Sequence, residues 1–275
     1  MTLRFPSTAR ILGFSCALLT AACLITTPAR ATSIGLDFGS GANGSADPDP
    51  SPMAASDVAG VVPQSNWNDL VGLSQATPQA LLNDQGLASG ATVTWLCNNL
   101  WDTSANGGTD AAGNARLMMG YLDSSDTSIT NVLVSNLPAA FTLSGYNVIV
   151  YYDGENGTTQ RVGQYTIGST VLYGRDAGVA FSGTFTQGQT ATAPVGALDN
   201  NAAGANAVPG GNYLVFTGLN ASTFTLTAQS SVSSDATNRA PINAVQIVQV
   251  PEPGAAALLL CATGAFSILR RRRAA

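Results

Sequence analysis

Histidine and lysine are missing from this sequence of 275 residues. Without histidine the chain lacks the commonest general base and a common metal ligand, which excludes histidine-dependent catalytic triads and typical zinc hydrolase sites. Between residues 32 and 250, four arginines stand against fourteen aspartates and one glutamate, so this piece carries a net charge near −11. Because phosphate binding requires a cationic surface, we expect no nucleic-acid partner.

Cysteine is nearly absent from the same piece. Cys16, Cys23 and Cys261 lie near the two ends of the chain, and only Cys97 lies between residues 32 and 250. A disulfide framework is therefore not expected. With no histidine to activate its thiol, Cys97 is predicted to be a buried apolar residue rather than a nucleophile.

The N-terminus has the pattern of a secretory signal peptide. Arg4 and Arg10 precede an apolar stretch over residues 11–25, and an Ala-Arg-Ala sequence ends at Ala31. A charged start, a short apolar centre and small residues at the cleavage site predict a signal peptide over residues 1–31. The alternative is a lipoprotein cut before Cys23, although Thr20 stands where such a site usually has leucine.

The C-terminus combines a short rigid motif, an apolar run over residues 255–269 and a basic end. The motif consists of Val250, Pro251, Glu252 and Pro253, and the basic end of Arg270, Arg271, Arg272 and Arg273. Fifteen residues form roughly 22 Å of helix, which is short of the roughly 30 Å hydrocarbon core, and the prolines prevent the helix from extending upstream. The arginines should keep this end on the cytoplasmic side of a membrane.

Residues 251–275 with this order of features closely resemble the PEP-CTERM sorting signal of Gram-negative bacteria. The resemblance implies export, transient retention in the inner membrane and processing by an exosortase-type enzyme, followed by a place at the cell surface or in the extracellular matrix. The alternative is an ordinary C-terminal membrane anchor, which has no physical need for the Pro-Glu-Pro sequence.

Residues 32–250, called the cargo below, carry many short strand patterns separated by polar turns. The expected strands are 34–38, 91–95, 129–134, 146–152, 161–167, 179–185, 212–216, 223–228 and 244–250. Residues 153–157 read as a tight turn that joins 146–152 and 161–167 into a hairpin, and only residues 67–82 have helical character. This pattern predicts an all-β domain, an antiparallel jelly-roll-like β-sandwich between the signal peptide and one C-terminal apolar helix.

The segment 239–248, with the sequence Arg-Ala-Pro-Ile-Asn-Ala-Val-Gln-Ile-Val, is similar to the last strand of malectin-like and galactose-binding-like sandwiches. The similarity spans ten residues. It implies a jelly-roll fold and no particular ligand.

One loop has oxygen-bearing side chains spaced as at the start of a calcium-binding loop. Asp102, Ser104, Asn106 and Asp110 supply the candidate ligands, but Gly113 stands where an EF-hand has its bidentate glutamate. A looser calcium site and a solvated polar loop without a metal both remain open, and no other cofactor is expected.

Aromatic and polar residues suggest a shallow site for a sugar. An indole face can pack on a sugar ring while polar side chains bind its hydroxyls, and the candidates are Trp67, Trp101, Arg116 and Tyr121. The alternative for Trp67 is a place in the core, and Trp101 is expected to be the more exposed ring.

A third pattern, a pair of carboxylates acting as glycosidase acid and base, has several candidate members and nothing that selects two of them. These are Asp102, Asp110, Asp123, Asp126, Asp153 and Glu155. We therefore expect an exported, non-catalytic polysaccharide-binding or adhesion module. A secreted glycan-active hydrolase and a purely structural matrix protein are the alternatives.

Overall fold

The computed structural model describes residues 31–39, 50–157, 159–176, 180–194, 208–233 and 239–251. Side chains at 232 and 233 are not among the described ones. All described residues belong to one compact unit that runs Arg30–Pro253. The expected signal peptide and the apolar tail helix lie outside the described residues.

The described part of the cargo is an all-β structure with three sheets. The five-stranded sheet has the order β12-β8-β14-β1-β2 and the seven-stranded sheet the order β11-β10-β9-β13-β7-β4-β3. The first consists of β12 (Tyr213–Leu219), β8 (Tyr146–Tyr151), β14 (Ala244–Gln249), β1 (Ser33–Phe38) and β2 (Asn68–Leu70). The second consists of β11 (Gly210–Gly211), β10 (Thr170–Asp176), β9 (Arg161–Ile167), β13 (Phe224–Ser233), β7 (Ile129–Ser135), β4 (Ala88–Leu96) and β3 (Ser74–Leu82).

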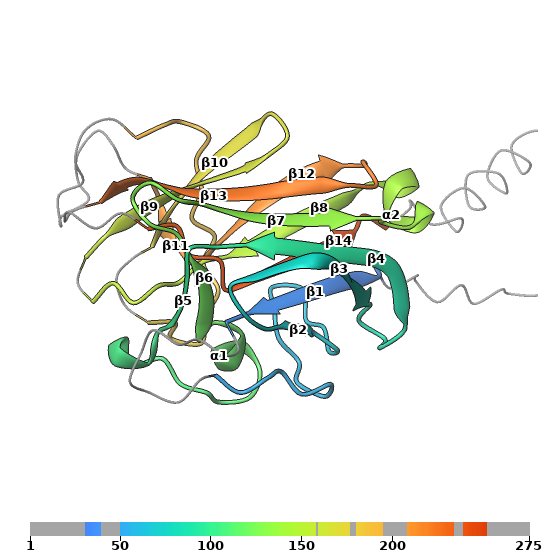
Figure 1. The fold of residues 1–275 in the computed structure, drawn as a ribbon, viewed down its shortest axis with the longest axis horizontal. Helices are drawn as coiled ribbons and strands as arrows, with labels where there is room; N and C mark the ends of the chain where they lie inside the picture. The colour runs from blue at the N-terminus through green and yellow to red at the C-terminus, as the bar shows by residue number, and fades with distance from the viewer. Residues whose placement is uncertain are drawn as a thin grey trace, which may run out of the picture. The chain divides into compact units, whose positions relative to one another are not determined.

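A short two-stranded sheet pairs β5 (Asn99–Asp102) with β6 (Gly120–Asp123). Between these strands lie the single turn η1 (Ser104–Asn106) and the helix α1 (Asn114–Leu117), while α2 (Ala139–Ser144) precedes β8. Figure 1 shows β5, β6 and α1 gathered beyond the ends of the long strands.

The two large sheets enclose the main hydrophobic core. One cluster of buried side chains combines Ile34, Val148 and Ile247 of the smaller sheet with Val132 and Leu226 of the larger one. Residues of β4 and β7 alternate between buried and more exposed positions, as expected for strands with one open face. Most residues of β1, β8 and β14 are buried whichever side of the sheet they point to.

Burial on the second face of the smaller sheet comes from chain segments outside the sheets. Tyr151 packs against Trp67 and Phe185, with ring centroids 6.2 Å and 5.1 Å apart. Met53, Ala59 and Phe181 belong to the same apolar cluster. This second cluster explains why residues on both faces of the central strands are buried.

Most of the expected strands are present, and three expectations are wrong. Residues 67–82 form β2 and β3 instead of a helix, because Gly72 turns the chain at a φ of 96° and the segment pairs with β1 and β4. β8 and β9 are not a hairpin, since they belong to different sheets. The described residues 180–185 of the expected strand 179–185 are not a strand, and their two phenylalanines cover Tyr151 instead.

Candidate functional site

Polar side chains gather where β8 ends. The chain leaves the sheet after Tyr151, and the three polar residues Asp153, Glu155 and Asn156 follow. The side chain of Asn243, just before β14, fixes the main chain of Asp153 by hydrogen bonds. Asp153 lines a cleft on one side of this loop, while Glu155 contacts β5 and β6 on the other.

The cleft has a volume of about 190 Å³ and is open to solvent. Its lining combines two carboxyl groups with one aromatic ring and several hydroxyl-bearing and small residues. These residues are Asp153, Asp176, Ala180, Phe181, Ser182, Thr184, Thr186, Gly210, Gly211 and Asn212.

Both carboxyl groups of the cleft are buried and hydrogen-bonded to the main chain. Oδ2 of Asp153 accepts a hydrogen bond of 2.7 Å from the amide of Phe181, and Oδ2 of Asp176 accepts one of 2.7 Å from the amide of Gly154. Burial, together with the charge of Asp176, raises the pKa of Asp153 to about 9, although the Phe181 amide acts in the opposite direction. At neutral pH Asp153 is therefore protonated and can donate a hydrogen bond.

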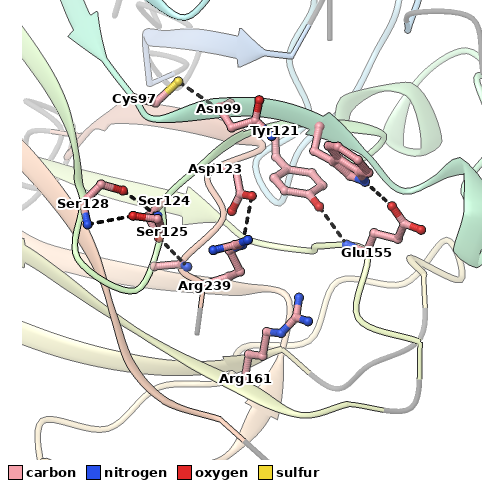
Figure 2. Close-up of polar contacts among 12 residues, drawn as sticks. Cys97, Asn99, Tyr121, Asp123, Ser124, Ser125, Ser128, Glu155, Arg161 and Arg239 are labelled. Atoms are coloured by element: carbon pink, nitrogen blue, oxygen red, sulfur yellow. Dashed lines mark hydrogen bonds and ion pairs between the residues drawn. The ribbon is translucent and has the colours of Figure 1, made fainter. Parts of the chain in front are cut away.

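On the other side of the loop, β5 and β6 present four side chains on one face. The antiparallel register places Trp101 opposite Tyr121 and Asn99 opposite Asp123. The indole nitrogen of Trp101 donates a hydrogen bond to the carboxylate of Glu155, and the amide of Glu155 donates one of 3.0 Å to the hydroxyl of Tyr121. Figure 2 shows this hydroxyl directed toward Glu155.

Asp123 is the buried acid of this face. Arg239 lies 3.2 Å from its Oδ2, and Figure 2 shows Arg161 on the far side of Arg239. Burial raises the pKa of Asp123 to about 6, while the charges of Arg239 and Arg161 oppose the increase. Its Oδ1 atom is buried and has no hydrogen-bond partner within the described part of the chain.

A serine-rich loop after β6 binds the main chain next to Arg239. The hydroxyl of Ser124 accepts a hydrogen bond of 3.0 Å from the amide of Ala240, next to Arg239. The main-chain amides of Ser125 and Ser128 each donate a hydrogen bond to the hydroxyl of the other residue, as Figure 2 shows. Cys97 is also labelled in Figure 2. It is buried as predicted, and burial raises the pKa of its thiol to about 11.

The structure brings together two of the four residues expected to bind a sugar. Trp101 and Tyr121 are cross-strand neighbours, and Trp101 is half-buried. Tyr121 is only 4% exposed, so its ring, like that of Trp67, offers no surface to a ligand, and its hydroxyl accepts a hydrogen bond from the amide of Glu155. Trp67 lies in the apolar cluster around Tyr151, so its ring cannot reach a ligand at the surface. Arg116 is occupied by two ion pairs, at 2.8 Å with Asp57 and 2.9 Å with Asp110.

The expected calcium loop is divided between two places. Oδ1 of Asp102 accepts hydrogen bonds from the amide and the hydroxyl of Ser104, whereas the carboxylate of Asp110 is bound by Ser51 and Arg116. Among the described residues no group of three or more acidic, cysteine or histidine side chains could hold a metal ion. A cation near the buried Asp102 would need ligands other than Asp110, and calcium stays a prediction.

Sequence reasoning missed the partner of Asp153. Asp176 is the last residue of β10, which the expected strands did not include. The sequence feature that indicates β10 is a hairpin. β9 and β10 are joined through Gly168 and Ser169, and their antiparallel register pairs Asp176 with Arg161. Two strand patterns separated by a glycine-containing two-residue turn could have located it.

No family model matches this chain, and no curated protein and no solved structure matches it either. Within the part of the chain that the structure describes, each helix is too short or too polar to cross a membrane.

Proposed function

We propose that this chain is an exported polysaccharide-binding protein whose cleft beside Asp153 and Asp176 holds one sugar residue. The observation that carries the proposal is the pair of buried carboxyl groups in an open cleft, one of them protonated at neutral pH. A jelly-roll-like arrangement of the two sheets, which places the cleft at one end of the strands, is part of the proposal.

The chemistry of the cleft suits a neutral sugar. A protonated Asp153 can donate to a sugar oxygen and Asp176 can accept from a sugar hydroxyl, while the ring of Phe181 offers an apolar surface to the sugar ring. The cargo carries a net charge near −11, so an anionic polysaccharide would be repelled. Neutral polysaccharides are therefore the proposed ligands.

Affinity electrophoresis of the purified protein in gels that contain neutral polysaccharides tests this proposal. Asp176→Asn should weaken retention about tenfold or more, because it replaces one of the two acceptor oxygens with an amide that cannot accept. Asp126→Asn, at an exposed position outside the cleft lining, is the matched control and should be retained like the wild type. If no neutral polysaccharide retards the wild-type protein, the proposal is wrong.

The same pair of carboxyl groups favours the second candidate function, a secreted glycan hydrolase. A carboxyl group that stays protonated at neutral pH can serve as general acid, and an ionised neighbour as base or nucleophile. Release of reducing ends from the retained polysaccharide, abolished in both Asp153→Asn and Asp176→Asn, would establish hydrolysis. Retention without any release of reducing ends supports the binding module.

Export and sorting form a separate part of the proposal and rest on the sequence of the two ends. We propose cleavage after Ala31, transient anchoring in the inner membrane, and processing at the Pro-Glu-Pro motif by an exosortase-type enzyme. Intact-mass spectrometry of the protein from its native host can compare the membrane fraction with the culture medium. Loss of the tail from medium material supports sorting, and a full-length chain found only in the membrane contradicts it.

A further inference from the structure

Residue 154 separates the cleft from the face of β5 and β6. A Cβ atom at Gly154 would lie 3.4 Å from Oδ2 of Asp176, which lines the cleft, and 3.4 Å from Oδ1 of Asn156. Asn156 in turn follows Glu155, whose side chain and amide bind Trp101 and Tyr121. The cleft and the β5–β6 face are therefore close enough for neighbouring residues of one polysaccharide chain.

Two buried polar atoms on this second side have no hydrogen-bond partner among the described residues. They are Oδ1 of Asp123, an acceptor, and Nδ2 of Asn156, a donor. Their residues are only 5% and 7% exposed, respectively. Folded proteins seldom leave such groups unsatisfied, so a water molecule or a ligand hydroxyl is expected to bind them. A sugar hydroxyl both donates and accepts, so it can satisfy either atom. An ionised carboxylate on a ligand only accepts hydrogen bonds and therefore cannot satisfy Oδ1 of Asp123.

The half-buried indole of Trp101 offers a surface for the sugar ring. Its hydrogen bond to Glu155 fixes the orientation of the ring. Arg239 covers Asp123 with a side chain that is 30% exposed. Arg239 bonds Oδ2 of Asp123, and its side chain must move aside so that a sugar hydroxyl can reach Oδ1.

We infer that the face formed by Trp101, Asp123 and Asn156 is a second sugar subsite, which binds the polysaccharide residue next to the one in the cleft. The inference rests on the proposed function, because it requires the cleft to hold the first sugar. The expected ligands are therefore chains of two or more neutral sugars, which should bind more tightly than free monosaccharides.

Isothermal titration of the full-length protein tests this inference. The probes are glucose, galactose and mannose, each as the monosaccharide and as its unbranched di- and tetrasaccharides. For the sugar that binds, the disaccharide should bind the wild-type protein about tenfold or more tightly than the monosaccharide. Asp123→Asn and Trp101→Ala should each remove this gain and leave monosaccharide affinity unchanged. Asp176→Asn should weaken both ligands alike.

The outcomes separate the two proposals. If no probe of any length binds the wild type, the proposed function fails, and the second subsite fails with it. If the monosaccharide binds and the gain from the second sugar is absent, or survives in both Asp123→Asn and Trp101→Ala, the cleft stands and the second subsite is wrong. Thermal unfolding of each variant, within a few degrees of the wild type, verifies that the fold is intact.

Discussion

Asn243 binds both main-chain polar groups of Asp153 through its side-chain amide. Its Oδ1 accepts a hydrogen bond of 2.6 Å from the amide of Asp153, and its Nδ2 lies 3.0 Å from the carbonyl oxygen of Asp153. The same Nδ2 lies 3.0 Å from the carbonyl oxygens of Met118 and Gly120, which precede and begin β6. One fully buried side chain therefore fixes the loop after β8 and the strand β6 relative to each other.

Replacing Asn243 by alanine should be strongly destabilising. It leaves several buried main-chain groups without a partner, and we expect a loss of about 2–4 kcal/mol in the free energy of unfolding. Urea unfolding followed by circular dichroism measures the loss. Asn220→Ala, at an exposed position, should change the free energy of unfolding by less than about 0.5 kcal/mol. Equal effects of the two substitutions would show that Asn243 does not have this role.

Arg116 is expected to stabilise the fold and to have no part in sugar binding. Arg116→Gln removes the ion pairs with Asp57 and Asp110 and should cost about 1–2 kcal/mol, because Asp57 is left largely buried without its cation. Retention by a neutral polysaccharide should not change. Affinity electrophoresis and urea unfolding of this variant, compared with Arg116→Lys, separate the two roles. A loss of retention with unchanged stability would restore Arg116 as a ligand-binding residue.

The strands that sequence reasoning predicted correctly have either a mostly apolar run, as in β8, or an alternation of apolar and polar residues, as in β13. β8 and β14 lie inside the smaller sheet, and their runs of valine, isoleucine and tyrosine follow from burial on both faces. β3 was missed because it is an exposed edge strand, and Ser74, Gln75 and Pro78 give it no apolar alternation. β5 and β6 have only four residues each, too few for a period to be recognised.

The candidate site could be predicted only in part, because its geometry depends on contacts between distant segments. Trp101 and Tyr121 were identified by their chemistry, but their cross-strand pairing depends on a register that the sequence does not state. Asp153 was one of six candidate carboxylates. Its partner Asp176 lies 23 positions further along the chain, and only the fold shows that both line one cleft.

Cys97 should react slowly with alkylating reagents in the folded protein. Its thiol is buried and has a pKa of about 11, so at pH 8 the reactive thiolate is about a hundredfold less populated than at the ordinary pKa of 9.0. The tryptic peptide of residues 31–116 contains Cys97 as its sole cysteine, so mass spectrometry after iodoacetamide treatment reports on this thiol alone. We expect rapid modification in urea and little in buffer. Rapid modification of the folded protein would mean that the thiol is accessible.

The protonated state of Asp153 should make the protein less stable as the pH rises. The pKa is about 9 in the folded protein, against an ordinary value of 3.8. Between these values the folded state holds a proton that the unfolded state has released. The free energy of unfolding therefore falls with rising pH, by up to about 1.4 kcal/mol per pH unit. The raised pKa of Asp123 also makes the free energy of unfolding fall with rising pH, but only up to a pH of about 6, which is the pKa of this group in the folded protein.

A comparison of pH 6.5 with pH 8.5 tests this contribution of Asp153. Burial also raises the pKa of Asp37 well above its ordinary value, so the difference between the wild type and an Asp153 variant, and not the decline itself, reports on Asp153. The wild-type protein should lose about 1–3 kcal/mol of unfolding free energy over this range. Asp153→Asn keeps an acceptor for the Phe181 amide and has no proton to lose, so its stability should decline clearly less than that of the wild type and should exceed it at pH 8.5. Asp126→Asn, which leaves the buried pair intact, should decline as the wild type does. Urea unfolding at both pH values checks the prediction, and an equal decline in Asp153→Asn would mean that Asp153 is ionised in the folded protein at neutral pH.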